Sequence, residues 1–239
     1  MSNFFFVGLP YASILIMIIG TIYRYQSLEF EYSSLSSQFL EGRTLYKGVR
    51  PFHWGLMFLF FGHLIGFLFP ETVLAWNGQY LRLLIIEIAA FGFALSALWG
   101  LIILIIRRLQ TKRIQIVTSK MDVVVYIVLF VQIVTGLIVA YFHRWGTSWF
   151  ASTMTPYLKS LFILSPDTAA LEAMPIFIQI HAISAFTILA IIPFTRFVHF
   201  LVYPFRYFFR SYQRVIWNWD KNKIRNSREI HVGKRPKNN

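Results

Sequence analysis

The sequence predicts an all-α integral membrane protein with five transmembrane helices, and three observations lead to this prediction. Of its 239 residues, 56% are hydrophobic and only 14% are charged, whereas a soluble domain has about 25% charged residues. The apolar residues form five long runs, and an α-helix needs roughly 20 such residues to cross a bilayer. Basic residues lie mainly on every second connection between the runs.

The five runs are the predicted spans of one helical domain. They cover residues 4–23, 52–69, 83–106, 123–142 and 176–193, the last with an extension to residue 199. The first run has neither a basic n-region nor an A-x-A-like cleavage site, so we interpret it as a retained helix and not as a signal peptide. The chain has no cysteine, which excludes disulfides, thiolate zinc sites and cysteine-held iron–sulfur clusters within it.

The distribution of basic residues predicts the orientation of these spans in the cell inner membrane. Of the 23 Lys and Arg residues, 20 follow the first, third and fifth runs, while Arg82, Arg144 and Lys159 lie on the other connections. Because basic residues near span ends stay in the cytoplasm, the N-terminus is expected outside and the C-terminus inside. The net charge of +13 therefore indicates topology and not nucleic-acid binding, since no basic run is interleaved with stacking aromatics.

The sequence also predicts where the membrane domain ends and what one of its connections contains. Residues 1–216 are expected to form the membrane domain. Residues 217–239 are expected to form a basic, polar cytoplasmic tail that is disordered or contacts anionic lipid or a partner. The connection at 148–172 contains the short apolar stretch TPYLKSLFIL, which is typical of a helix lying at the membrane interface.

Four histidines lie in or at the end of two spans: His53 and His63 in the second, His181 and His199 in the fifth. One membrane histidine is equally well explained by a hydrogen bond to a neighbouring helix, but ionisable groups are costly in a bilayer and four of them indicate function. On regular helices the first pair is separated by about 15 Å and the second by about 27 Å on one face. Antiparallel spans then pair His53 with His199 near the cytoplasm, and His63 with His181 nearer the outside.

Two levels with two imidazoles each fit two b-type haems with bis-histidine ligation, because imidazole is an axial haem ligand. A zinc site fits less well, since neither level has a third ligand nearby. The unequal spacings require tilted helices or a bend at Pro193, which lies between the two histidines of the fifth span. A transporter or assembly anchor that uses the histidines for metal or proton traffic is the alternative of a different class, and it predicts no stoichiometric haem.

Residues beside the histidines have two interpretations each. Gly62 leaves room for a flat macrocycle to approach the backbone, or it packs helices together with Gly66 as a small-xxx-small pair. Arg50 and Arg196 each lie three residues from a histidine of the cytoplasmic level and could pair with haem propionates. As anchors that hold the span ends on the cytoplasmic side, both arginines would look the same.

Several stretches of the chain resemble the gamma, or cytochrome b, subunit of membrane-bound respiratory nitrate reductase. They are FHWGLMFLFFGHLIGF in the second run, IHAISAFTILAIIPFTRFVH and YPFRYFFRSYQ at the end, PYLKSLFILSPD, RYQSLEFEYSSLSSQFL and RRLQTKRIQIVTSKMD in the connections. The resemblance covers about residues 4–214. It implies five helices with the N-terminus outside, and two b haems held by His53 with His199 and by His63 with His181.

The same resemblance implies that the chain oxidises quinol and that it has two partner subunits. Family members oxidise membrane quinol near the outer haem and pass electrons to an iron–sulfur (beta) subunit and a molybdenum-containing (alpha) subunit, where nitrate is reduced. Related cytochrome b subunits of nitrite oxidoreductase, sulfur-cycle or heterodisulfide-type complexes are the alternative within the same class. Surrounding lipid completes the expected set of partners.

Two residues of the third span are candidates for the quinol site. Arg82 falls where the resemblance places a lysine, and its guanidinium could hydrogen-bond a quinol oxygen; the alternative is snorkelling to lipid phosphate. An arginine cannot release its proton as a lysine can, which argues against an acid–base role. Glu87 could accept a quinol proton or serve as a hydrogen-bonded structural residue. Asp122 is expected to stabilise the N-terminus of the fourth helix, and His143 is expected to be interfacial.

Overall fold

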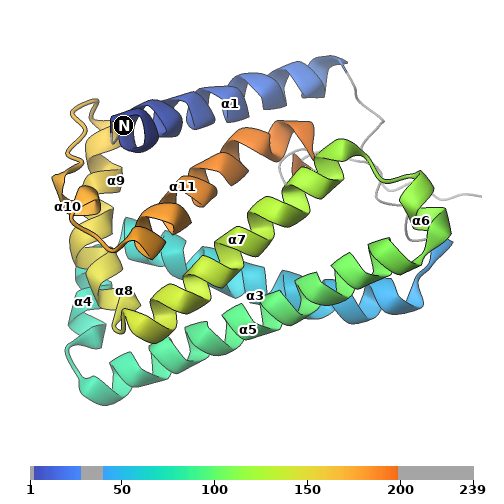
Figure 1. The fold of residues 1–239 in the computed structure, drawn as a ribbon. Coiled ribbons are helices and arrows are strands. Elements are labelled where there is room, and N and C mark those ends of the chain that lie inside the picture. The colour runs from blue at the N-terminus through green and yellow to red at the C-terminus, as the bar shows by residue number, and fades with distance from the viewer. Residues whose placement is uncertain (1–2, 28–39, 199–239) are drawn as a thin grey trace, which may run out of the picture. The chain divides into compact units, whose positions relative to one another are not determined.

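A computed structural model describes residues 3–27 and 40–198, which belong to one compact unit. Within these residues every regular element is a helix (Figure 1). Five helices are long and apolar enough to cross a membrane, which confirms the predicted number of spans and the all-α class. The expected boundary between residues 216 and 217 lies outside the described residues, and the orientation of the termini stays a prediction.

The five spans begin and end close to the apolar runs, with two extensions. The first span is formed by the π-helix η1 (Phe4–Gly8) and helix α1 (Leu9–Ser27). The second is α3 (Arg43–Leu68), which begins well before the predicted start, and the third is α5 (Tyr80–Gln110), which extends a few residues past the predicted run at each end. The fourth and fifth are α7 and α11, at Lys120–Phe142 and Ile176–Ile191. Helix α3 continues through Pro51, although proline removes a backbone hydrogen bond, because neighbouring helices in a membrane protein support such a position.

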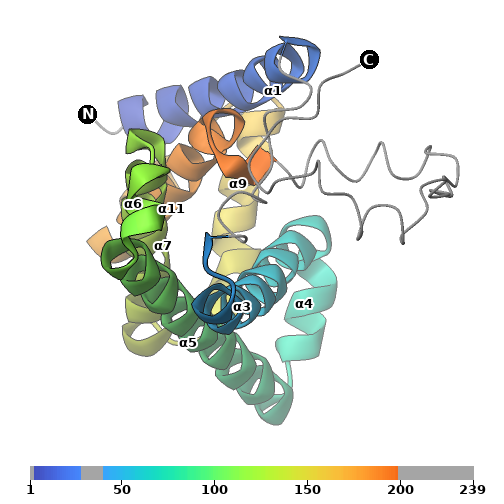
Figure 2. The ribbon, with the colours of Figure 1, turned by 90° about the vertical axis from the view of Figure 1, so that its right-hand side faces the viewer.

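The spans pack in the order α3, α5, α7, α11, α1 (Figures 1 and 2). Glycines bring α3 and α5 into close contact. A Cβ atom on Gly55 would lie 2.6 Å from the Phe93 carbonyl oxygen, and one on Gly100 would lie 2.5 Å from the Phe52 backbone nitrogen. Only residues without a side chain allow such a backbone approach, so α3 is held firmly along α5.

Short helices gather at one end of the spans, where α3 ends and α11 begins (Figure 1). The connection between α3 and α5 holds α4 (Pro70–Asn77). The connection that was expected to hold one interfacial helix holds four helical elements, which are α8, η2, α9 and α10 at Gly146–Trp149, Phe150–Met154, Thr155–Phe162 and Ala169–Glu172. The stretch TPYLKSLFIL does form a helix, α9. It links η1, at the start of the first span, to α3, because Tyr157 Oη donates to Phe6 O at 2.8 Å and Thr155 Oγ1 donates to Gly66 O at 3.2 Å.

At the opposite end, where α6 (Lys112–Ile116) lies, the expected role of Asp122 is confirmed. Ser119 and Asp122 form a capping box at the start of α7. The Asp122 carboxylate also accepts from Arg108 Nη1 at 3.1 Å and lies 3.5 Å from Arg196 Nε. One acidic side chain thus joins the N-terminus of α7 to two basic residues from other elements.

The fifth span ends differently from the regular helix that the histidine spacing assumed. Helix α11 ends at Ile191, a 3-10 turn follows at Ile192–Phe194 (η3), and Thr195 is extended before a second turn at Arg196–Val198 (η4). Pro193 has no N–H to continue the helix, so the predicted bend is present. The fifth span is therefore not the regular helix that the spacing of about 27 Å assumed, and His199 itself lies outside the described residues.

Candidate functional site

His63 of α3 and His181 of α11 face each other near the end of the spans that carries the short helices. Each lies five residues from the end of its helix on that side. Their ring centroids are 6.4 Å apart and their planes are inclined by 35°. Two metal–imidazole bonds of about 2 Å each, together with the radii of two rings, require centroids roughly 6 Å apart. The separation of the rings therefore suits two axial ligands of one iron.

The hydrogen bonds of the α3 histidines leave one nitrogen of each ring available. His63 Nδ1 lies 2.8 Å from Leu59 O, and His53 Nδ1 lies 3.0 Å from Val49 O. Because a carbonyl oxygen only accepts, each Nδ1 carries the proton and each Nε2 keeps its lone pair. A donated N–H of this kind orients and tunes metal-bound histidines. Both α3 rings thus have the tautomer that a haem ligand needs.

The His181 ring lies against one turn of α7. Its Nδ1 is 3.0 Å from Gln132 O and 3.2 Å from Thr135 Oγ1, and its Nε2 is 3.1 Å from Gln132 Nε2. Gly136 leaves space for the ring, since a Cβ atom there would lie 2.9 Å from His181 Cε1. The three α7 residues hold the imidazole in one position and leave its Nε2 as an acceptor. In tautomer and in separation, the residues present fit a haem with two imidazole ligands.

The α7 residues around His181 were not predicted from the sequence. Gln132 and Thr135 are polar residues within the apolar run of span four, and Gly136 follows directly. Positions i, i+3 and i+4 share one face of a helix, so this pattern was the available signal. It could not name the partner, because nothing local in the sequence places α7 against the histidine of α11.

Of the two histidines predicted near the cytoplasm, only one lies within the described residues. His53 is exposed, and its predicted partner His199 lies outside the described residues, so this pairing stays a prediction. Arg50 donates from Nη1 to Tyr46 Oη at 2.8 Å and lies over the Tyr46 ring. Arg196, the other candidate for a propionate, is held near Asp122 as described above.

The two glycines near His63 differ in their surroundings. Among the described residues, a Cβ atom on Gly62 would meet nothing within 4 Å, whereas one on Gly66 would lie 3.0 Å from the Phe150 ring. Phe150 also contacts the His63 ring edge-on, with centroids 5.1 Å apart. Helix packing therefore explains Gly66 and does not explain Gly62, whose open side leaves room beside the candidate ligand.

Arg82 and Glu87 lie on the first turns of α5 and have separate surroundings. Arg82 is exposed, and its guanidinium lies 5.0 Å from the centroid of the Trp76 ring. Glu87 Oε1 accepts from the backbone N and from Oγ1 of Thr147, at 2.8 and 2.7 Å. Glu87 thus anchors the start of α8. In residues 3–27 and 40–198, no hydrogen bond, ion pair or ring contact joins Arg82 to Glu87 or to His63.

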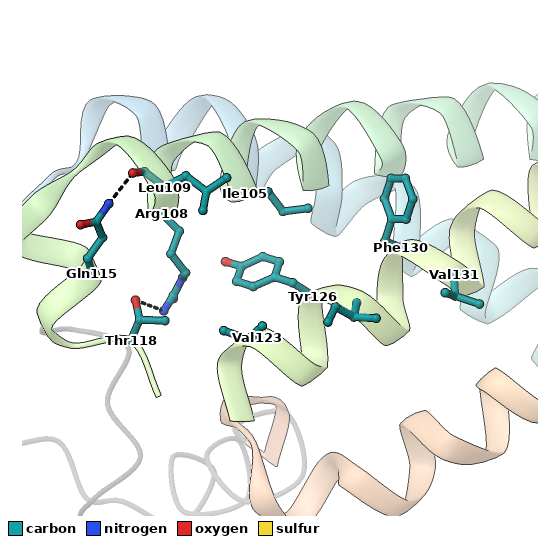
Figure 3. A pocket seen from close by; sticks show the side chains of 10 residues that line it. Ile105, Arg108, Leu109, Gln115, Thr118, Val123, Tyr126, Phe130 and Val131 are labelled. Carbon is teal, nitrogen blue, oxygen red and sulfur yellow. Dashed lines mark hydrogen bonds between the residues drawn. The ribbon is translucent and has the colours of Figure 1, made fainter. Parts of the chain in front are cut away.

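A groove with a volume of about 450 Å³ lies between α5 and α7 at the other end of the molecule (Figure 3). The Arg108 guanidinium lies 5.3 Å from the Tyr126 ring centroid at this groove. None of the candidate residues that the structure describes lines it; the lining comprises Ile105, Arg108, Leu109, Gln115, Thr118, Val123, Tyr126, Ile127, Phe130 and Val131. The groove is thus separate from the histidine site.

Comparison with known proteins gives a consistent family. The model of the family described as nitrate reductase gamma subunit matches residues 2–218. The nitrate reductase gamma chain of Bacillus subtilis is 32% identical over 85% of this chain and 93% of its own length. The respiratory nitrate reductase 2 gamma chain of Escherichia coli is 27% identical over 90% and 96%. The nitrate reductase-like protein NarX of Mycobacterium tuberculosis is 29% identical over 89% of this chain and 33% of its own length.

Proposed function

We propose a specific electron-transfer role for this chain, which belongs to the nitrate reductase gamma subunit family and is a membrane cytochrome b subunit. In this role the chain oxidises quinol near the outer face of the cell membrane and delivers electrons to the cytoplasmic side. The observation that carries the proposal is the placement of His63 and His181, with ring centroids 6.4 Å apart. Both rings carry the proton on Nδ1, so each Nε2 keeps the lone pair that a metal would take; that of His181 accepts from Gln132 Nε2 at 3.1 Å.

The proposed ligand sets follow the two levels of histidines. His63 and His181 hold the iron of the outer b haem, and His53 with His199 holds that of the inner one. When bound, the two haems supply one-electron carriers between the quinol and the partner subunits. The chain's own contribution is to fix the imidazoles by the Nδ1 hydrogen bonds to carbonyl oxygens, at 2.8 Å for His63 and 3.0 Å for His53. Gly62 adds an open side at the outer level.

The proposed reaction converts one quinol to one quinone, with two protons released outside and two electrons moved inward. Arg82 is the proposed quinol contact, because its exposed guanidinium can donate to a quinol oxygen. Glu87 is the weaker candidate, as a proton acceptor, because its carboxylate already accepts two hydrogen bonds from Thr147. Protons released outside and electrons moved inward both add to the membrane potential.

The proposed partners are an iron–sulfur beta subunit and a molybdenum-containing alpha subunit on the cytoplasmic side. The names of the relatives support this, since they describe gamma chains of nitrate reductases. Arg50 and Arg196 are weaker candidates for contacts with the propionates of the inner haem, because Tyr46 and Asp122 already contact them. A related redox complex with another terminal acceptor would use the same ligands, and co-purification of the partner subunits distinguishes the two.

The test is the haem content and the reduced-minus-oxidised spectrum of the purified chain. Two b haems per chain are expected, and His63→Ala should remove one of them. His143→Ala is the matched control, because His143 lies just beyond α7 at the same end and has no proposed ligand role. A chain with fewer than two b haems, or one in which both histidine variants lose haem equally while remaining folded, would contradict the proposal. A transporter or anchor would contain no stoichiometric haem.

A further inference from the structure

We infer that one turn of α7, formed by Gln132, Thr135 and Gly136, sets the orientation and the electron donation of His181 toward its iron. We call these three residues the imidazole seat. The inference rests on the proposed function, because it concerns the outer haem ligand. It extends that function by assigning positioning roles to three residues on a helix that contributes no proposed ligand.

The first step concerns the proton on His181 Nδ1. Thr135 Oγ1 donates its own proton to Val131 O at 2.7 Å, with a longer contact of 3.2 Å to Gln132 O. Toward the ring, the hydroxyl is therefore an acceptor, as is the Gln132 carbonyl oxygen at 3.0 Å from Nδ1. Two acceptors facing Nδ1 place the proton there. The lone pair of the ring is then on Nε2, the nitrogen that ligates iron.

The second step concerns the strength of the ligand. A histidine that donates its second N–H to an oxygen is a more basic metal ligand. A more basic ligand stabilises the more positively charged, oxidised iron and lowers the reduction potential. His63 has one such acceptor, Leu59 O, whereas His181 has two. Thr135 is the second acceptor, and it can be replaced without altering the backbone of α7.

The third step concerns the side chain of Gln132. Its amide Nε2 lies 3.1 Å from His181 Nε2, and its Oε1 accepts a hydrogen bond from Ser184 of α11. The amide therefore occupies the lone pair that iron would take, because one nitrogen has a single lone pair to share. Gln132 keeps the ring in the binding tautomer before haem arrives, and it must release Nε2 when iron binds.

The fourth step concerns the plane of the ring. Gly136 lies under His181 Cε1, where a Cβ atom would be 2.9 Å away. A contact under 3.0 Å forces a shift, so a side chain at residue 136 must turn or displace the imidazole. A Cβ atom on Gly92 of α5 would meet nothing within 4 Å in the part of the chain that the structure describes.

The experiment compares two pairs of variants in the haem-loaded full chain. Thr135→Val should raise the midpoint potential of the haem that His63→Ala removes, with haem content unchanged, and Thr135→Ser should restore it. Thr187→Val is the control, because the Thr187 hydroxyl likewise donates to the carbonyl four residues earlier, Ile183 O, and makes no contact with His181 in the described residues. Gly136→Ala should alter the electron paramagnetic resonance signal of that haem, and Gly92→Ala should not.

The outcomes separate this inference from the proposed function. A wild-type chain without b haem contradicts both. Suppose that the chain has two b haems, but that the midpoint potential of the outer haem is unchanged in Thr135→Val or shifts equally in Thr187→Val. This result would contradict the role of the imidazole seat and leave the proposed function standing. If Gly136→Ala fails to fold, the threonine pair still decides the matter, since valine has nearly the shape of threonine.

Discussion

The Arg107 guanidinium donates from Nε to Glu41 Oε2 at 2.8 Å and from Nη2 to the Glu41 carbonyl oxygen at 2.6 Å. Arg107 is only 4% exposed, so this pair joins the last turn of α5 to the residues just before α3. Burial alone raises the pKa of Glu41, but hydrogen bonds from the Thr44 backbone, Arg107 and the Leu45 backbone outweigh it, and the pKa is lowered.

The lowered pKa of Glu41 predicts a loss of stability in acid. The folded carboxylate holds its proton less strongly than the unfolded one, whose ordinary value is 4.5. The stabilisation is therefore complete above that pH and is lost as the pH falls through the folded pKa. Thermal unfolding in detergent should show Glu41→Gln less stable than wild type at pH 7, by about 1–3 kcal/mol, with the difference shrinking below about pH 4. Exposed Glu71→Gln is the control.

Tyr157→Phe should lower stability by about 1 kcal/mol, because it removes a buried hydrogen bond and keeps the ring. The Tyr157 hydroxyl donates to Phe6 O at 2.8 Å, and the residue is 1% exposed. Burial raises the pKa of this phenol, with Tyr11 nearby as a smaller cause, so it remains a neutral donor. Unfolding temperature in detergent is the measurement. Tyr141→Phe, at a residue 63% exposed, should change nothing, and an equal loss there would contradict the assigned bond.

Gly55→Ala should destabilise the bundle, since the new methyl group would lie 2.6 Å from Phe93 O and 2.7 Å from the Ala97 backbone nitrogen. Overpacking of this kind costs about 1–3 kcal/mol. Gly92→Ala, whose methyl group would meet no described residue within 4 Å, should keep or raise stability by up to about 1 kcal/mol through helix propensity. Chemical denaturation of the two variants checks this, and a Gly55→Ala chain as stable as Gly92→Ala would show that α3 and α5 can separate freely.

Arg82→Ala should raise the KM for quinol in haem reduction by roughly 10- to 100-fold, which corresponds to the loss of one hydrogen bond to a charged group. Haem content should stay unchanged, because Arg82 contacts Trp76 and no candidate ligand in the described residues. Arg144→Ala removes the same charge from the same end of the molecule and serves as the control. Unaltered kinetics with a soluble quinol analogue would show that Arg82 only anchors the span.

Glu87→Gln separates a structural role from a proton-accepting one. Glutamine keeps an oxygen that can accept from Thr147, as Glu87 Oε1 does at 2.7 and 2.8 Å. A structural residue therefore predicts turnover within about twofold of wild type, whereas Glu87→Ala should lose about 1–3 kcal/mol of stability. A large loss of quinol oxidation in a well-folded Glu87→Gln chain, together with a changed pH profile, would instead assign proton transfer to Glu87.

The features that the sequence predicted well depend on local composition. Five apolar runs correspond to five spans, and Asp122 at the start of the fourth is part of a capping box with Ser119, because both features depend on neighbours in the chain. The break after Ile191 was foreseen only as a bend at Pro193, since sequence alone does not give the length of the 3-10 turn. The pairing of Glu87 with Thr147 and the residues around His181 depend on contacts 46 to 60 positions apart, as in the Thr135 bond to His181.

The tight glycine contact between α3 and α5 has a kinetic consequence. His53 and His63 lie on one uninterrupted helix, so ten residues of α-helix, about 15 Å of rise, separate their levels. Electron tunnelling slows steeply as the distance between carriers grows, and the close contact at Gly55 fixes the register of α3 along α5. In the proposed function, the regular rise of α3 would thus set the spacing of the two haem levels along this helix, and with it the scale of the electron-transfer rate between them.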